Sequence, residues 1–130
     1  MFSHVNLGTK DLEQAVAFFD AVLKPLGIEQ KFCQREMGWA GWQHRDYPRP
    51  LFLVGLPVDG GTQSSGNGQM LALQAGNRQQ VDQCHAIALT MGARDDGAPG
   101  LRPQYHPDYY GAYFRDLDNN KICICCHEAE

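Results

Sequence analysis

The stretch HVNLGTKDLEQAVAFFDAVLKPLG, residues 4–27, places a strand directly before a helix. Val5 and Leu7 alternate with polar neighbours, which is the period of a half-buried β-strand. Asp11 followed by Gln14 is a variant of the capping box, so a helix is predicted to begin there. Its apolar residues recur at helical spacing: Leu12, Ala15, Val16, Phe19, Val22, Leu23 and Leu26. A proline and a glycine at the end of the stretch predict the end of the helix.

The same order of elements returns later in the chain. Leu71 and Leu73 alternate with their neighbours, and Asn77 with Gln80 repeats the cap. The second apolar stripe consists of Val81, Cys84, Ala88 and Met91. Further strands are predicted at residues 38–43 and 51–56 after the first helix, and at 111–115 and 122–126 after the second. Asp and Asn residues at 116–120 predict a hairpin turn between the last two strands. The pattern indicates an internal duplication.

These elements predict one α+β domain, residues 1–130, of paired βαβββ modules. The first module covers about 1–58, a polar linker about 59–67, and the second module about 68–130. One face of each sheet should be covered by the apolar face of its helix, so the other face is free to form a pocket. Val5 and Leu7 are expected to face the helix, with His4 and Asn6 on the opposite side. We therefore expect a curved mixed sheet around a cup-shaped pocket.

Composition excludes several classes of partner. A net charge of −4 and a pI near 5.7 leave no basic stripe to neutralise phosphates, which argues against nucleic acid or an anionic membrane surface as a partner. No apolar run approaches the length of a bilayer span, and the N-terminus does not resemble a signal peptide. Five cysteines are an odd number, and their spacing is not that of a secreted disulfide framework. A cytoplasmic protein with reduced thiols is expected.

The sequence CICCH, residues 123–127, matches the C-x-x-C-H pattern of covalent haem attachment. In a strand, however, Cys123 and Cys126 should point to opposite faces, because side chains alternate along the backbone. One haem or metal cannot easily bind both of these cysteines. The alternation therefore argues against a local haem or metal site.

The chain resembles the vicinal oxygen chelate superfamily, which includes glyoxalases, bleomycin resistance proteins and extradiol dioxygenases. The resemblance rests on residues 4–7, 11–20 and 23–27 in the first module, and on 98–103, 106–112 and 115–122 in the second. It implies two βαβββ modules that form a cup, commonly completed by dimerisation. It also implies a divalent metal in the cup that polarises oxygen atoms of a small-molecule substrate. Members include lyases, isomerases, transferases, dioxygenases and plain binders, so the resemblance leaves the reaction open.

The metal ligands that the resemblance implies are largely missing. His4 matches the ligand of the first strand, but Met70 and Cys123 stand where a histidine and a glutamate are usual. The fourth position, within residues 51–54, has only apolar side chains. One histidine does not hold a hard or borderline divalent ion, so no metal ligand and no cofactor are assigned. Imidazole, thioether and thiol form a softer set, which leaves copper(I) or zinc as an alternative.

Candidate site residues lie on the expected pocket face and in one loop. We assign His4, Tyr105 and His106 as candidate catalytic residues, because imidazole and phenol groups can move protons. The candidate substrate-binding residues are Met70, Cys123, Arg102, Tyr110 and Trp42. Each also has a purely structural interpretation, such as a hydrogen-bonded histidine, a small apolar cysteine or a loop packed onto the sheet.

Three functions fit this sequence. The first is a glyoxalase-like protein that binds a small organic molecule in the sheet cavity and acts as a metal-free lyase or isomerase. The second is a non-catalytic protein that binds a drug or an aromatic metabolite and confers resistance. The third is a structural dimer without ligand. A homodimer is expected in each case, and whether the chain is an enzyme stays open.

Overall fold

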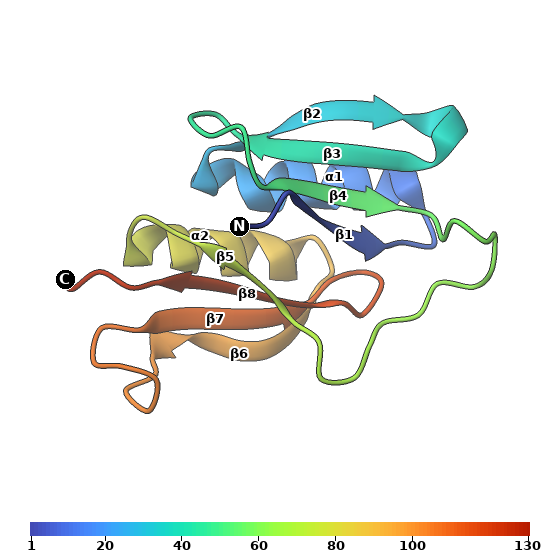
Figure 1. Cartoon of the computed structure of the whole chain (residues 1–130). Helices are drawn as coiled ribbons and strands as arrows, with labels where there is room; N and C mark the ends of the chain where they lie inside the picture. Colours follow the sequence, from blue (N-terminus) through green and yellow to red (C-terminus); the bar gives the residue numbers. More distant parts are fainter.

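The structure, a computed structural model, describes all residues from Met1 to Glu130. The first module contains β1 (His4–Gly8), α1 (Leu12–Leu23), β2 (Ile28–Gln34), β3 (Trp39–His44) and β4 (Leu51–Gly55). The second contains β5 (Leu71–Gln74), α2 (Arg78–Thr90), β6 (Arg94–Leu101), β7 (Tyr110–Arg115) and β8 (Lys121–Cys126). Both modules therefore have the βαβββ order, and the predicted α+β class is confirmed (Figure 1).

The strands form two separate four-stranded sheets, with orders β1-β4-β3-β2 and β5-β8-β7-β6. In each sheet the first strand pairs parallel with the last strand of its module, and the other pairs are antiparallel. The strands β1 and β5 are thus edge strands with one unpaired side. The two sheets share one plan, as expected for a duplicated module.

Both helices begin at the residues that the sequence predicts. The Asp11 side chain accepts a hydrogen bond from the Gln14 backbone N–H at 3.1 Å, and Asn77 accepts one from Gln80 at 2.9 Å. Each bond satisfies a backbone donor that has no partner inside the helix. After α1 a short 3₁₀ turn leads to Gly27, whose positive φ of 74° reverses the chain.

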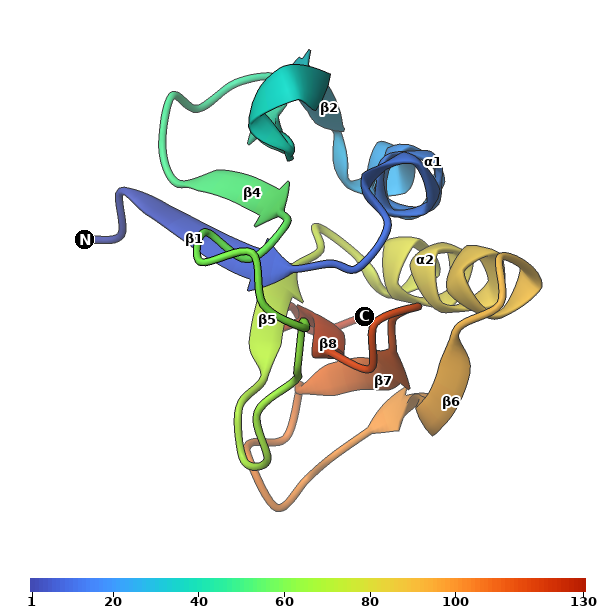
Figure 2. The ribbon, with the colours of Figure 1, turned by 90° about the vertical axis from the view of Figure 1, so that its right-hand side faces the viewer.

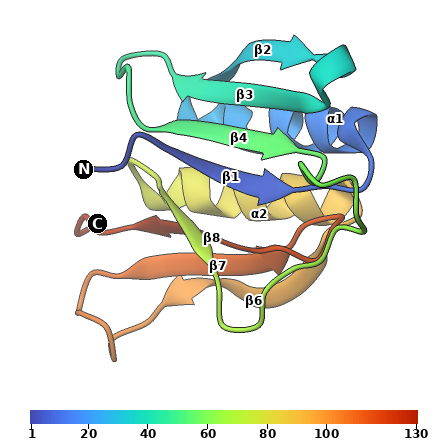
Figure 3. The ribbon, with the colours of Figure 1, turned by 45° about the vertical axis from the view of Figure 1, so that its right-hand side comes forward.

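The helices lie between the two sheets. Phe18 on α1 packs against Phe114 of β7, with ring centroids 6.1 Å apart, so the first helix contacts the second module as well as its own. Residues of both modules form a single core of 21 buried residues. Figure 2 shows the sheets opening as a V with α1 and α2 inside the angle, and Figure 3 shows the helices behind the strands. The uncovered sheet faces therefore point away from each other.

Polar contacts join the modules at one end. The Asn120 side chain donates to the Gly8 carbonyl at 3.0 Å and to the Asp116 carboxylate at 3.0 Å. The Lys10 backbone N–H donates to Asp118 at 3.0 Å. Residues 116–120 form the predicted turn, in which Asn119 has a positive φ of 66°. This turn is thus a tertiary link as well as a hairpin connection.

Neither helix is long and apolar enough to cross a bilayer.

Candidate functional site

Each sheet has a face turned away from the helices, called here its free face. In the first sheet the register pairs His4 with Leu51 and Asn6 with Leu53, and these residues lie on the free face. Val5 and Leu7 lie on the helix side, as predicted from their alternation. His4 is exposed, and its Nδ1 is 2.9 Å from the Ser3 hydroxyl.

Aromatic and aliphatic side chains dominate the free face of the first sheet. The Phe32 and Trp39 rings are 4.9 Å apart in an edge-on arrangement, and the Trp39 indole N–H donates to Gln34. Gly41 lies beneath them, where a Cβ atom would come within 2.4 Å of the Phe32 ring and 2.8 Å of Leu53. A side chain at this position would displace the aromatic wall. The glycine therefore lets the rings lie flat on the strand.

The free face of the second sheet has a different chemistry. It holds a group of phenol, thiol and imidazole side chains, called here the Cys123 cluster: His106, Tyr109, Tyr113, Cys123, Cys125 and His127. Cys123 and Cys125 share this face because they are two residues apart on β8, while Cys126 belongs to the core. The structure thus separates Cys123 from Cys126, as the alternation predicts.

Hydrogen bonds connect the Cys123 cluster. The Tyr109 hydroxyl is 2.9 Å from the Tyr113 hydroxyl and 3.4 Å from Cys123 Sγ. His127 Nε2 is 3.7 Å from Cys125 Sγ. On the other side of its ring, His127 Nδ1 is 2.8 Å from His106 Nε2, and the two rings stack. The hydrogen bonds thus form two groups, Tyr113–Tyr109–Cys123 and His106–His127–Cys125, and the Tyr109 ring contacts both histidine rings.

The cluster changes the acidity of its members. The polar side chains beside the Cys123 thiolate, first Cys125 and then Tyr109 and Tyr113, lower the pKa of Cys123 to about 7, although burial opposes this. The same interaction with Cys123, together with burial, raises the pKa of Cys125. Burial and the hydrogen bond to Cys123 raise the pKa of Tyr109. The cluster thus favours a negative charge on one sulfur, Cys123 Sγ.

Cations lie beside the cluster. The Arg102 guanidinium and the Lys121 ammonium lie over the Tyr113 ring, 5.5 Å and 5.6 Å from its centroid. The Asp96 carboxylate is 3.1 Å from Arg115 and 3.8 Å from Lys121. Asp96 therefore pairs with two of the three cationic side chains, and Arg102 forms no ion pair.

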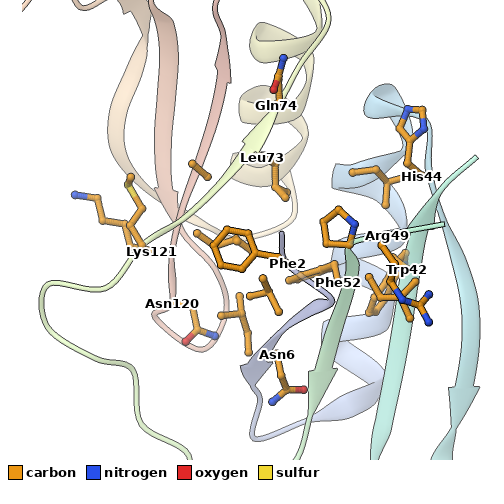
Figure 4. A pocket seen from close by; sticks show the side chains of 18 of the residues that line it. Phe2, Asn6, Trp42, His44, Arg49, Phe52, Leu73, Gln74, Asn120 and Lys121 are labelled. Atoms are coloured by element: carbon orange, nitrogen blue, oxygen red, sulfur yellow. The ribbon is translucent and has the colours of Figure 1, made fainter. Parts of the chain in front are cut away.

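A large cleft of about 1180 Å³ lies between the edge strands β1 and β5. Apolar side chains from both modules line it, including Phe2, Leu7, Phe52 and Leu73. Polar side chains also line it, among them Asn6, Arg49, Asn120 and Lys121 (Figure 4). Met70 also lines this cleft, but neither His4 nor Cys123 does. In a single chain the three residues therefore do not share one hollow, contrary to the cup expected from the sequence.

The candidate residues fall into separate groups. Arg102, His106 and Cys123 come together at the Cys123 cluster, and Tyr105 packs on Tyr109 while remaining 63% exposed. Met70 is 47% exposed at the edge of the same sheet. His4 lies apart, on the free face of the other sheet.

Two candidate residues point towards the helices. The Trp42 ring is buried against Phe19 of α1, and its N–H donates to Asp20 at 2.9 Å. The Tyr110 hydroxyl donates to Asp82 on α2 at 2.6 Å, which raises the Tyr110 pKa. Trp39, rather than Trp42, is the tryptophan on the free face.

Sequence reasoning did not single out Tyr113, Cys125 or His127 for the site. Two of them could have been predicted. Cys125 is two residues after Cys123 on β8 and therefore points to the same face, and Tyr113 of β7 pairs with Cys123 of β8. His127 follows the last strand, so alternation cannot place it. Only the tertiary structure shows that it stacks on His106.

The residues present do not fit a divalent metal ion. The positions implied by the resemblance supply one imidazole from His4, one thioether from Met70 and one thiol from Cys123, with Leu51 and Leu53 on the fourth strand. Hard and borderline ions need several oxygen or imidazole donors, and no carboxylate contributes here. Within the chain no group of three or more His, Cys, Asp or Glu side chains is arranged to hold a metal.

Comparisons with known proteins agree with this architecture. A glyoxalase/bleomycin resistance protein from Albidiferax ferrireducens is 33% identical over 98% of this chain and 99% of its own, with a TM-score of 0.88. A glyoxalase/bleomycin resistance protein/dioxygenase family enzyme from Burkholderia phytofirmans shares the fold at 20% identity, covering 97% and 98% of the two chains, with a TM-score of 0.71.

The fold also recurs in the fosfomycin resistance protein FosX from Mesorhizobium loti, at 14% identity, coverage of 98% and 92%, and a TM-score of 0.69. No family model matches the chain, and no curated protein matches it. The paired βαβββ modules and the full-length similarity to the Albidiferax protein lead to one conclusion. The chain belongs to the glyoxalase/bleomycin resistance protein group of the vicinal oxygen chelate superfamily.

Proposed function

We propose that this protein binds a small organic molecule that has an apolar body and a carbonyl or anionic oxygen, in a cup made by two copies of the chain. The observation behind the proposal is the contrast between the two free faces. One is an aromatic and aliphatic wall around Trp39, and the other presents hydroxyls and cations around Tyr113. An amphipathic ligand between such faces would bury its body and satisfy its oxygens.

The direction of the free faces supports a homodimer. In one chain these faces point away from each other, because the helices fill the angle between the sheets (Figure 2). A second copy can bring the free face of its second sheet opposite the free face of the first sheet. The unpaired edges of β1 and β5 and the apolar cleft between them would also be covered by such a partner.

Ligand binding without a divalent metal is part of the proposal, because the donor set does not fit such an ion. A metal-free lyase or isomerase is the second candidate. It is favoured by two proton-carrying groups on the ligand face, the His106 imidazole and the Cys123 thiol, whose pKa is lowered to about 7. A cytoplasmic location also belongs to the proposal and agrees with five unpaired cysteines.

Thermal-shift measurements would test binding, since a ligand of the folded state raises the melting temperature of the protein. The panel would contain aromatic carboxylates, 2-oxoaldehyde thiol adducts and antibiotics that include fosfomycin. For a ligand so found, Arg102→Gln should weaken affinity by roughly 10-fold or more, because a hydrogen bond to a charged group contributes about 1.5–3 kcal/mol. Tyr110→Phe is the matched control, since Tyr110 lies on the helix side. Equal affinity of the Arg102→Gln and wild-type proteins would contradict the proposed ligand face.

Two controls separate the remaining alternatives. Metal analysis of untagged protein should find no stoichiometric ion, and an ion that is lost in His4→Ala would overturn the metal-free proposal. Turnover of a bound panel compound that falls in His106→Gln would establish the lyase or isomerase. Binding without turnover would establish a binding protein.

A further inference from the structure

The end of the chain folds back onto the loop that precedes β7. His127 follows the last residue of β8, and its Nδ1 lies 2.8 Å from Nε2 of His106 in that loop. The two ring centroids are 5.1 Å apart, and the ring planes are 25° from parallel. Further on, the Glu130 carboxylate accepts a hydrogen bond from the Arg78 backbone N–H of α2 at 2.6 Å. Residues 127–130, called here the C-terminal tail, are thus held at two points.

Each contact of the two imidazoles requires a defined number of protons. The Asp108 backbone N–H donates to His106 Nδ1 at 3.2 Å, so this nitrogen must have no proton. A neutral His106 then has its proton on Nε2 and donates it to His127 Nδ1. Neutral His127 in turn has its proton on Nε2, which lies 3.7 Å from Cys125 Sγ. Two protons on the four ring nitrogens therefore satisfy every contact.

A third proton does not fit this arrangement. On His106 Nδ1 it would face the Asp108 N–H, and on His127 Nδ1 it would face the proton of His106 Nε2. Moving the His106 proton from Nε2 to Nδ1 removes the second conflict only by creating the first. Every protonated form of the pair therefore loses a hydrogen bond, because two N–H groups point at each other.

No neighbouring charge compensates for this conflict. Neither ring takes part in an ion pair. The side chains that face the pair are the Tyr109 ring, edge-on to both histidines at 5.7 Å and 5.4 Å, and the Cys125 thiol. Asp108 and Glu128 are the carboxylates nearest in sequence, and neither forms an ion pair. The cation of the loop, Arg102, lies over the Tyr113 ring instead.

We propose that the His106–His127 pair is a pH-sensitive clamp, which joins the C-terminal tail to the loop at neutral pH and opens as the pH falls. The closed form requires both rings to be neutral, so it is complete at neutral pH and is lost on acidification. A free imidazole side chain gains a proton below about pH 6.5, so mild acidification supplies the proton that opens the clamp.

The clamp acts on the ligand face through Tyr109. The Tyr109 ring contacts both imidazoles, and its hydroxyl lies 2.9 Å from the Tyr113 hydroxyl. Opening the clamp removes the contact on one side of the ring, so the hydroxyls of this face lose their fixed position. Ligand affinity should then fall several-fold, a consequence that rests on the function proposed above. The opening itself is measured without ligand.

NMR spectroscopy of the ligand-free protein tests the clamp. At about pH 7.5, above the protonation range of free imidazole, the ring nitrogens should show the Nε2–H tautomer for both histidines. Relaxation of the backbone amides should then show residues 127 and 128 as ordered as β8. Acidification to about pH 5 should make both residues mobile. His127→Phe retains an aromatic ring without ring nitrogens, so its tail should be mobile at both pH values.

His44→Gln is the matched control. His44 Nδ1 accepts a hydrogen bond from the Asp46 backbone N–H at 3.0 Å, as His106 does from Asp108, but no second imidazole binds to it. This variant should retain the wild-type response of the tail to pH. A wild-type tail equally ordered at both pH values, or an Nδ1–H tautomer of His106 at neutral pH, would overturn the proposal.

Ligand binding separates the clamp from the function proposed above. A panel compound should bind His127→Phe several-fold more weakly than wild type at neutral pH, and equal affinity would contradict the action of the clamp on the ligand face. If the tail responds to pH as expected and no panel compound binds, the clamp is supported and the proposed function fails.

Discussion

Buried cysteines have two different environments in this chain, and their neighbours determine the consequence of each. Cys84 on α2 is buried among apolar side chains, and burial raises the pKa of its thiol to about 12. Cys126 is part of the same core. Cys123 is equally buried, but its polar neighbours, first Cys125 and then Tyr109, lower its pKa to about 7. The sequence predicted that Cys123 and Cys126 point to opposite faces of their strand, but the acidity of each buried thiol depends on the side chains that the fold brings around it.

Asp95 links β6 to α2 through His85, whose Nε2 lies 3.0 Å from Asp95 Oδ1. Hydrogen bonds from the Gly97 backbone N–H and then from His85 lower the pKa of Asp95. A carboxyl group with a lowered pKa in the folded state stabilises the fold above its unfolded pKa of about 3.9, and this contribution is lost as pH falls through the folded pKa. We therefore expect Asp95→Asn to be less stable than wild type at pH 7.

Urea denaturation of both proteins over a pH series would check this expectation. The difference in the free energy of unfolding should shrink as the pH falls below the unfolded pKa of Asp95. A difference that stays constant from neutral to strongly acidic pH would show that the charge of Asp95 is not involved.

The elements differ in how well their sequence predicts them. The buried stripe of α1 was predicted except for Phe18, because a helix that covers a sheet has a regular apolar spacing. The strands β2 and β6 were not located, because both are edge strands with mixed exposure and an irregular register. Phe18 was missed for a related reason, since it faces the other module rather than its own sheet. Periodicity thus reveals burial within a module but not contacts between modules.

The N-terminus of α1 provides a test at the level of one element. Asp11→Ala removes the acceptor for the Gln14 N–H and should lower the free energy of unfolding by about 1 kcal/mol. Asp11→Asn retains an acceptor oxygen and should lose much less. Chemical denaturation followed by circular dichroism measures both. Equal losses in the two variants would show that the charge, and not the cap, is what stabilises the helix.

At the scale of the whole molecule, duplication predicts two similar modules but not their relative placement. The sequence predicted that His4, Met70 and Cys123 lie on sheet faces that share one cup. In the chain the helices pack between the sheets, so His4 lies on one free face and Cys123 on the other. Packing of α1 against the second module depends on side chains such as Phe18, whose partner Phe114 on β7 no local pattern identifies. A shared cup therefore requires a second copy.

Light scattering tests most directly whether the ligand-binding cup requires a second copy of the chain. It would measure the mass of the wild-type protein in solution at the concentration used for ligand binding. One chain has a mass of 14.5 kDa, so the account predicts twice that value, about 29 kDa, for the ligand-bound species. Ligand bound at saturation by a species of 14.5 kDa would contradict it, because a single chain does not bring its two free faces together.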